Sequence, residues 1–324
     1  MNDSNTMTYI YLLVNKIIKI FSPAIQLFER RFHKKYASTE LRHQPVFIIG
    51  APRTGSTILY QTITNQLDVL YFDNLICGLK NSLMVGFWLS AKIFKNRPHD
   101  SFQSYHGNTT KFGSRAPSEC GQFWYRWLPA DRHFINNEDV DGTMVDQIRS
   151  EISSIINYYN KPLVFKNLNA GQRLRLLKKC FPEAKFIFMH REPIYAAQSI
   201  LLSKRKIGIR DNEFWGIMPR NYKELIPLDP FEQIVKQIYY IEKQIEVDSN
   251  LFETKNFINV DYSELGDDFA NTIKICQDFI GAKDRSGFAQ AEVKISNSIK
   301  LHTEEIRKFE IEIKNLNWTN YSHK

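Results

Sequence analysis

The sequence predicts an α/β fold in which a central parallel sheet lies between two layers of helices. Short apolar runs, rich in β-branched and aromatic residues, recur at 46–49, 162–166, 184–191 and 256–260. Amphipathic helical stretches separate these runs, and several of the runs lead into a basic residue. Strands that alternate with helices are typical of parallel βαβ units, so we expect a three-layer fold.

Length and composition favour a globular protein with an anionic partner. The chain has 324 residues, of which 43% are hydrophobic and 24% charged, so it can bury a core. Its formal net charge of +8 suits nucleic acid, an anionic membrane or a highly anionic small ligand. Because no nucleic-acid-binding motif is visible, we expect no nucleic-acid partner. We divide the chain into an N-terminal helical extension, 1–43, and a larger domain, 44–324.

Residues 9–32 are typical of a helix that is apolar on one side. Asn15 and two lysines interrupt the apolar run before it reaches the ~20 residues that a membrane span needs. Three roles stay open for this helix: packing on its own domain, packing on a second subunit in a homodimer, and peripheral contact with an anionic membrane through residues 9–35. Residues 33–45 are predicted to form a polar linker.

The four cysteines are scattered along the chain at Cys77, Cys120, Cys180 and Cys276. They form no C-x-x-C pair and have no histidine at ligand spacing, so we expect no metal site. Scattered cysteines also fit a reducing environment, and we therefore predict a cytoplasmic location, with peripheral membrane contact left open.

A glycine-containing turn follows the first predicted strand. The apolar run leads into Gly50-Ala51-Pro52-Arg53-Thr54-Gly55-Ser56-Thr57, and an amphipathic helix comes next. The spacing of the two glycines is that of the phosphate-binding loop G-x-x-x-x-G-K-[ST], with Ser56 in place of the lysine. Glycines let backbone amides approach a phosphate, and a helix N-terminus favours an anion. We therefore expect this P-loop-like turn to bind a phosphate, although not a triphosphate, because Arg53 is its only cation.

The next segments include a long loop. Residues 69–72 are predicted to form a short strand and 79–94 a helix rich in aromatic residues. Residues 95–118 show little periodicity and are predicted to be a surface loop, of a length that is often functional. The loop leads to Glu119, a carboxylate followed by an aromatic cluster within 123–127.

Two further predicted helices, 143–159 and 171–180, each lead into a strand. The strands end at Lys166 and Arg191, as the first strand leads to Arg53. Ligands of parallel sheets collect at the carboxyl ends of the strands. We therefore expect these three cations to converge on one edge of the sheet.

The rest of the sequence continues the alternation. Glu192-Pro193 opens a helix that carries Ser199 about two turns beyond the preceding strand. A long helix from residue 229 has an apolar stripe that is typical of the core, and the last clear strand is 256–260. Residues 300–324 are predicted to form a charged helix and an aromatic end.

The two phosphate elements make the chain resemble sulfotransferases that use 3′-phosphoadenosine 5′-phosphosulfate (PAPS). In that family the first loop binds the 5′-phosphosulfate, while an arginine at a later strand end and a serine on the next helix bind the 3′-phosphate. The matching residues are Pro52-Arg53-Thr54-Gly55-Ser56-Thr57, Phe188-Met189-His190-Arg191-Glu192-Pro193 and Ser199, with further similarity at 260–265 and 279–281. The resemblance covers residues 45–281 and implies that PAPS, or its product PAP, is the bound nucleotide.

Departures from the family pattern place the chain nearer the bacterial and carbohydrate-type branches than the cytosolic steroid and phenol enzymes. The loop cation is Arg53, no histidine follows the second strand, Asn167 follows Lys166, and the late R-K-G-x-x-G element is absent. In the branches that this chain resembles, a glutamate often acts as the base.

The resemblance implies sulfuryl transfer to a hydroxyl or amine, with Glu119, Lys166 and Arg53 as catalytic residues. PAPS has phosphates at both ends of its adenosine and needs two separated anion sites, which the chain supplies. Arg53 and Lys166 would meet the charge on the departing phosphate, and Glu119, desolvated by its aromatic neighbours, would accept the proton. His106 is the next candidate for the base and His190 a weaker one.

Two other function classes stay open. A P-loop kinase or NTPase that uses ATP and Mg²⁺ would need a lysine at position 56 and a strand-end aspartate, for which Asp261 is the stand-in. A non-catalytic anion-binding protein could use the same fold. The acceptor also stays open among saccharide, lipid, small natural product and peptide, and the aromatic residues of 79–127 favour an apolar or sugar face.

Overall fold

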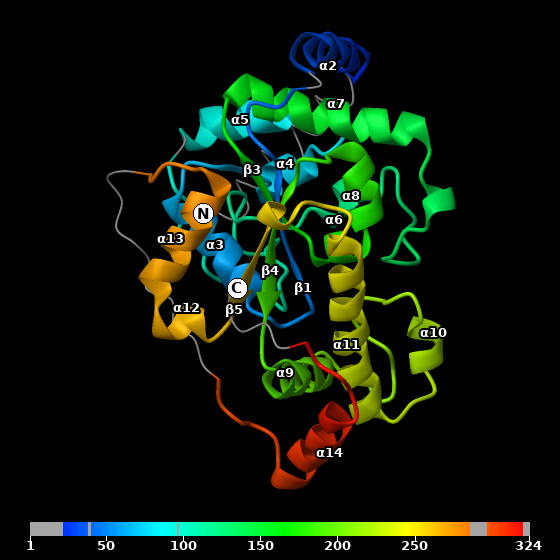
Figure 1. Cartoon of the computed structure of the whole chain (residues 1–324). Helices are drawn as coiled ribbons and strands as arrows, with labels where there is room; N and C mark the ends of the chain where they lie inside the picture. Colours follow the sequence, from blue (N-terminus) through cyan, green and yellow to red (C-terminus); the bar gives the residue numbers. More distant parts are fainter. Residues whose placement is uncertain (1–21, 38–39, 96, 286–296, 320–324) are drawn as a thin grey trace.

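A computed structural model describes residues 22–37, 40–95, 97–285 and 297–319. Within these ranges five parallel strands form one sheet in the order β2-β3-β1-β4-β5 (Figure 1). The strands are β1 Val46–Gly50, β2 Leu70–Tyr71, β3 Leu163–Lys166, β4 Lys185–His190 and β5 Phe257–Asp261. The predicted parallel sheet is therefore confirmed.

The helices of the described part cover the sheet on both faces (Figure 1). The longer helices are α2 Ser22–Tyr36, α3 Ser56–Gln66, α5 Leu83–Phe94, α7 Gly142–Tyr159, α8 Leu174–Cys180, α9 Pro193–Lys206, α11 Pro230–Ser249, α13 Phe269–Ile280 and α14 Thr303–Lys314. The short ones are α4 Asn74–Gly78, α6 Gly121–Trp124, α10 Tyr222–Leu225 and α12 Glu264–Asp267, and 3-10 turns occupy Asn137–Asp139, Leu168–Gln172 and Thr254–Asn256.

Alternation along β1 divides the core between the two faces. Phe47 and Ile49 belong to a large cluster with α7, α8, α9 and α11, whereas Val46 and Ile48 pack with α3 and α13. Successive strand residues point to opposite faces, and an apolar residue at every position is typical of a strand buried on both sides. The Phe47 ring stacks on Phe165 of β3, with ring centroids 4.9 Å apart. Helices on both faces make the fold three-layered, as predicted.

The register brings three strand ends together. Ile48 of β1 lies opposite Lys166 of β3, and Gly50 lies opposite Met189 of β4. Because β1 is central, the turn after Gly50 emerges between the ends of its two neighbours. The expected convergence of Arg53, Lys166 and Arg191 follows from this strand order.

Three predicted element boundaries are wrong. The predicted helix 79–94 begins only at Leu83, as α5. Residues 74–78 before it form the separate short α4, which Asp73 caps by accepting a hydrogen bond of 2.7 Å from the Ile76 amide. The predicted helix 171–180 begins only at Leu174, and a 3-10 turn in which Gly171 packs closely against the Ile245 side chain precedes it. The predicted linker 33–45 is helical as far as Tyr36.

Helix α2 packs on its own domain. Phe32 is buried, and its ring meets Tyr158 of α7 edge-on with centroids 5.2 Å apart. Glu29 is also buried, and its carboxylate accepts hydrogen bonds from the Met84 and Val85 amides at 3.4 and 3.0 Å. A carboxylate at these free amides of α5 is favourable because it meets the positive end of the helix dipole. Of the three predicted roles, packing on its own domain is therefore confirmed for residues 22–36.

The predicted helical residues 9–21 lie outside the described residues. In the described ranges no helix has both the length and the apolar character needed to cross a bilayer. The boundary between 1–43 and 44–324 stays a prediction.

Candidate active site

The turn between β1 and α3 depends on its glycines. Gly55 has φ 84° and immediately precedes α3, and a side chain added there would overlap the ring of Tyr262. Glycine alone combines that backbone conformation with such a close approach at no steric cost. Thr54 is fully buried, and its hydroxyl donates a 2.9 Å hydrogen bond to the Ala51 carbonyl, so its side chain holds the turn in shape.

Ser56 and Thr57 open α3 and face a cavity of about 430 Å³, which Arg53 and Gly55 also line. The first amides of an α-helix have no partner within the helix and carry the positive end of its dipole. The turn thus presents free amides, two hydroxyls and a guanidinium to one cavity, as expected of an anion site.

The end of β4 reaches the same turn. Arg191 donates from Nη1 to the Arg53 carbonyl at 3.0 Å, and its guanidinium lies 4.1 Å from the centroid of the Tyr262 ring. Its Nε and Nη2 donate to Asn297 Oδ1 at 3.2 and 3.0 Å. Arg191 therefore holds the loop backbone and also directs two donors at a single oxygen.

Arg53 links the loop to α9. Its Nε donates a 2.9 Å hydrogen bond to the hydroxyl of Ser199, which lies 146 positions later in the chain. Ser199 borders a second cavity, of about 380 Å³, together with Gln198, Lys206 and Lys300. Both cavities share four lining residues, which are Arg53, His106, Arg191 and Tyr262. The two predicted phosphate elements thus border two neighbouring cavities with a common wall, which together we call the cleft.

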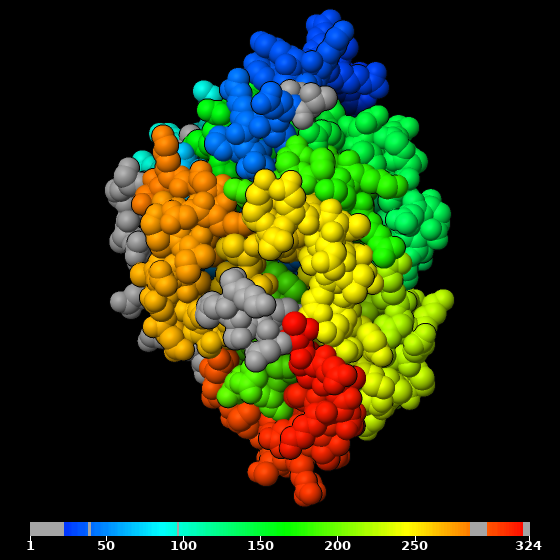
Figure 2. Space-filling view, in the orientation of Figure 1, coloured from blue at the N-terminus to red at the C-terminus, as the bar shows by residue number. Residues whose placement is uncertain are grey.

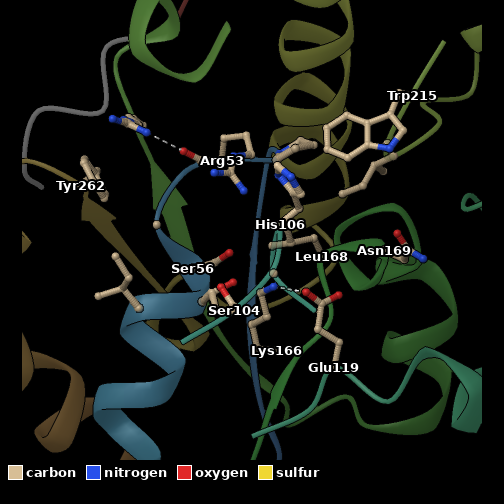
Figure 3. Close-up of a pocket in the computed structure, with 18 of the residues that line it drawn as sticks. Arg53, Ser56, Ser104, His106, Glu119, Lys166, Leu168, Asn169, Trp215 and Tyr262 are labelled. Carbon is tan, nitrogen blue, oxygen red and sulfur yellow. Dashed lines mark hydrogen bonds and ion pairs between the residues drawn. The ribbon is translucent and has the colours of Figure 1, made fainter. Parts of the chain in front are cut away.

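Lys166 and Glu119 form an ion pair in this cleft (Figure 3). The Lys166 side chain is 3% exposed and that of Glu119 is 38% exposed. The backbone of Gly107 lies over the pair, so that a side chain there would meet Glu119, Lys166 and Thr57. The predicted catalytic lysine and carboxylate are therefore neighbours and face the phosphate loop.

The predicted environment of Glu119 is wrong. Phe123 and Trp124 are buried in the core, where Trp124 packs near Phe47, and neither lines the cleft. Glu119 comes before α6, whose N-cap residue is Cys120. Its surroundings are a cationic side chain and solvent rather than aromatic rings.

The other two base candidates occupy different surroundings. His106 lines both cavities, and neither of its ring nitrogens has a hydrogen-bond partner among the described residues. Burial lowers the pKa of His106, and Arg53 and Lys206 lower it further. His190 is buried beside Asn259, where burial lowers its pKa to about 4. His190 lines neither cavity.

The cleft is electrostatically suited to an anion. Burial is the main cause that lowers the pKa of both Arg53 and Arg191, because a desolvated guanidinium loses favourable hydration. An anion bound between them would offset that loss. No described carboxylate forms an ion pair with Arg53.

Several lining residues were not predicted from the sequence. Tyr262, Trp215, His133 and Asn169 all border the first cavity, as do Leu168 and Ile217. Tyr262 follows the last strand and supports Arg191, and its place after a strand end is a signal that could have identified it. Trp215 and His133 lie in irregular segments where no pattern indicates a site.

A parallel sheet with a phosphate-type turn after its central strand defines an α/β protein with a P-loop-like fold. A family described as "Sulfotransferase family" matches residues 45–285. This match covers most of the chain, and the chain therefore belongs to the sulfotransferase family. No curated protein sequence matches the chain at a significant level.

Solved structures of bacterial sulfotransferases are similar to this one. Sulfotransferase STF9 from Mycobacterium avium aligns with a TM-score of 0.50 and 12% identity over 93% of this chain and 74% of that one. Sulfotransferase STF1 from Mycobacterium tuberculosis H37Rv aligns with a TM-score of 0.47 and 14% identity over 86% and 72%. At such identities the first alignment supports the fold alone.

Proposed function

We propose that the protein transfers the sulfuryl group of PAPS to a hydroxyl or amine of an acceptor. The observation that carries this proposal is the contact between Arg53 and Ser199, because it joins the loop after β1 to the helix after β4. A nucleotide with phosphates at both ends needs two anion sites in one cleft. Membership of the sulfotransferase family supports sulfuryl transfer in general.

The two anion sites would hold opposite ends of the nucleotide. The 5′-phosphosulfate would lie on the amides of the turn, with the hydroxyls of Ser56 and Thr57 as further donors. The 3′-phosphate would lie between Arg191 and Ser199. Arg191 already directs Nε and Nη2 at one amide oxygen of Asn297, and a phosphate oxygen could take its place with a stronger, charge-assisted bond.

The Lys166–Glu119 pair supplies a positive charge for the departing phosphate and a carboxylate that can accept the proton of the acceptor. As the bond from sulfur to the departing phosphate breaks, Lys166 would meet the negative charge that develops on the phosphate. The acceptor oxygen or nitrogen forms the new bond to sulfur and passes its proton to Glu119. PAP leaves as the second product. A bound anion attracts Lys166 away from Glu119, so the carboxylate would become available when the donor binds.

The acceptor would lie against an apolar wall. Trp215, Leu168 and Ile217 border the first cavity. In Figure 3, Trp215 and Leu168 lie on the other side of the cavity from Ser56 of the polar turn. The aromatic residues of 79–127 do not supply this wall, because Phe87, Phe123 and Trp124 are buried in the core. An aromatic and aliphatic wall suits an acceptor with an apolar or sugar face.

A kinase or NTPase is less well supported by the site. Position 56 is a serine rather than the lysine of a kinase. Asp261 is the stand-in for a magnesium ligand, but it accepts hydrogen bonds from Ser263 and borders neither cavity.

A cytoplasmic location and a homodimer stay predictions.

Thermal shift with PAP and with ATP-Mg²⁺ tests the nucleotide assignment. We expect PAP to raise the unfolding temperature by several degrees, because a ligand at 100 times its Kd adds ~2.7 kcal/mol to the stability of the folded state. ATP-Mg²⁺ should give a smaller shift at equal concentration. A larger shift with ATP-Mg²⁺ would support the kinase class instead, and no shift with either nucleotide would contradict both.

Ser199→Ala should weaken PAP binding by roughly 2–12-fold, the equivalent of one neutral hydrogen bond of ~0.5–1.5 kcal/mol. Ser249→Ala, on α11 and outside the cleft, is the matched control and should bind PAP like the parent. Calorimetric titration gives both affinities. Equal affinities for the parent and Ser199→Ala would remove Ser199 from the 3′-phosphate site.

A further inference from the structure

Helix α2 presents a cationic and apolar face to solvent. Figure 2 shows α2 standing out at one end of the molecule. Leu27 and Phe28 are each 52% exposed, although both are large and apolar. The exposed cations of the same helix are Arg30, Arg31, Lys34 and Lys35. Large apolar side chains exposed among cations are typical of a helix that binds a surface.

The solvent-exposed side of α2 carries no negative charge. Its one acidic residue is Glu29, which is buried and accepts hydrogen bonds from the Met84 and Val85 amides. The carboxylate that could neutralise the face is therefore held against α5. These bonds also hold α2 at the N-terminal end of α5.

Helix α5 contributes side chains of the same kind. Trp88 is 47% exposed, and Lys92 follows four residues later, on the same side of the helix. Lys95, which is exposed too, comes directly after the end of α5. The α5 sequence contains no acidic residue. We name the exposed side chains of α2 and α5 the α2–α5 surface: Leu27, Phe28, Arg30, Arg31, Lys34, Lys35, Trp88, Lys92 and Lys95.

We propose that the α2–α5 surface binds the anionic face of a lipid bilayer. Cations provide long-range attraction to acidic headgroups, and tryptophan, phenylalanine and leucine can insert at the interface. The sequence just before α2, residues 9–21, is also apolar with two lysines, which extends this composition along the chain.

Two other occupants fit the surface less well. A second copy of the chain would set the cations of both α2 helices against one another, and like charges repel. Nucleic acid would use the cations but would leave Leu27 and Phe28 without a role, since phosphate contacts need only positive charge. An anionic bilayer would contact both the cations and the apolar side chains of this surface.

Membrane binding in this orientation leaves the cleft accessible. In Figure 1, α2 lies at the top of the molecule and α9 in its lower part, below the sheet, and Ser199 of the cleft belongs to α9. The bound protein would therefore receive nucleotide and acceptor from the aqueous side. This proposal does not depend on the proposed function.

Vesicle co-sedimentation of the full chain tests the proposal. We expect binding to phosphatidylcholine vesicles that contain about one third phosphatidylserine, weaker binding to pure phosphatidylcholine, and partial release at high salt. Replacing two cations, in Arg31→Ser with Lys34→Ser, should weaken binding by about 25-fold, since each cation near the surface contributes about fivefold. Phe28→Ser with Trp88→Ser should weaken binding at low and at high salt.

Lys223→Ser with Arg307→Ser is the matched control, because it removes two exposed cations from α10 and α14. This control should bind vesicles like the parent, and circular dichroism should show all variants folded. Equal losses in the control and in the α2 variant would show that net charge alone drives binding and would overturn the assignment. Vesicle binding that none of the substitutions changes would also overturn the assignment. RNA binding that is tighter than vesicle binding, and that Phe28→Ser with Trp88→Ser does not weaken, would overturn it as well.

Discussion

Replacing Glu119 with glutamine is expected to lower kcat by about 10²–10⁴-fold, the usual effect of removing a general base. Glutamine keeps the size of the side chain but cannot accept the proton of the acceptor. PAP affinity should stay within about threefold, because Glu119 contacts Lys166 rather than the phosphate loop. Steady-state kinetics at saturating PAPS and acceptor, with PAP titrations alongside, separates the two effects.

The control for this experiment is His106→Asn, which removes the next candidate for the base. Turnover of Glu119→Gln within about threefold of the parent would show that the base is elsewhere. If His106 were the base, the acid limb of the kcat profile would lie below the ordinary pKa of histidine, because burial and two cations lower the pKa of His106. In that case kcat would fall only as the pH drops below this lowered pKa, where the ring becomes protonated.

Lys166→Met should lower kcat by about 10²–10³-fold, as expected when one donor to a developing negative charge is lost. Methionine preserves much of the bulk at a position that is 3% exposed, so the fold should survive. The loss should appear mainly in kcat, since the interaction strengthens as the phosphate departs. Single-turnover rates with saturating PAPS measure the loss in the transfer step directly.

Lys161→Met is the matched control for Lys166→Met, because Lys161 forms an ion pair with Asp68 outside the cleft. It should turn over like the parent. A Lys166→Met variant that raises KM and leaves kcat unchanged would make Lys166 a binding residue only. Because Glu119 and Lys166 are paired, the effects of Glu119→Gln and Lys166→Met should not add in the double variant.

The sheet and the phosphate elements could be predicted because local patterns encode them. Four of the five strands of the described part are uninterrupted apolar runs, and a basic side chain comes at or soon after the ends of β1, β3 and β4. Parallel strands place their carboxyl ends on one edge, so the meeting of Arg53, Lys166 and Arg191 follows from spacing and strand order.

The surroundings of Glu119 could not be predicted in the same way. Cys120 has φ 44°, a left-handed conformation that turns the chain between Glu119 and α6. The aromatic residues of α6 therefore enter the core while Glu119 faces the cleft, although they are neighbours in sequence. Trp215 and His106 reach the cleft from irregular segments, and only the folded chain shows that they meet, with ring centroids 6.1 Å apart.

The most direct test of the two-site cleft compares PAP with adenosine 5′-monophosphate, which lacks the 3′-phosphate. Calorimetric titration of the parent and of Arg191→Ala with both nucleotides gives four affinities. Arg191→Ala should weaken PAP binding by roughly 10–150-fold, the equivalent of ~1.5–3 kcal/mol for a charged hydrogen bond. Binding of the monophosphate should weaken by a clearly smaller factor, because its 5′-phosphate lies on the loop, to which Arg191 contributes only the hydrogen bond to the Arg53 carbonyl. Equal losses for the two nucleotides, or an unchanged PAP affinity, would contradict the placement of the 3′-phosphate at Arg191.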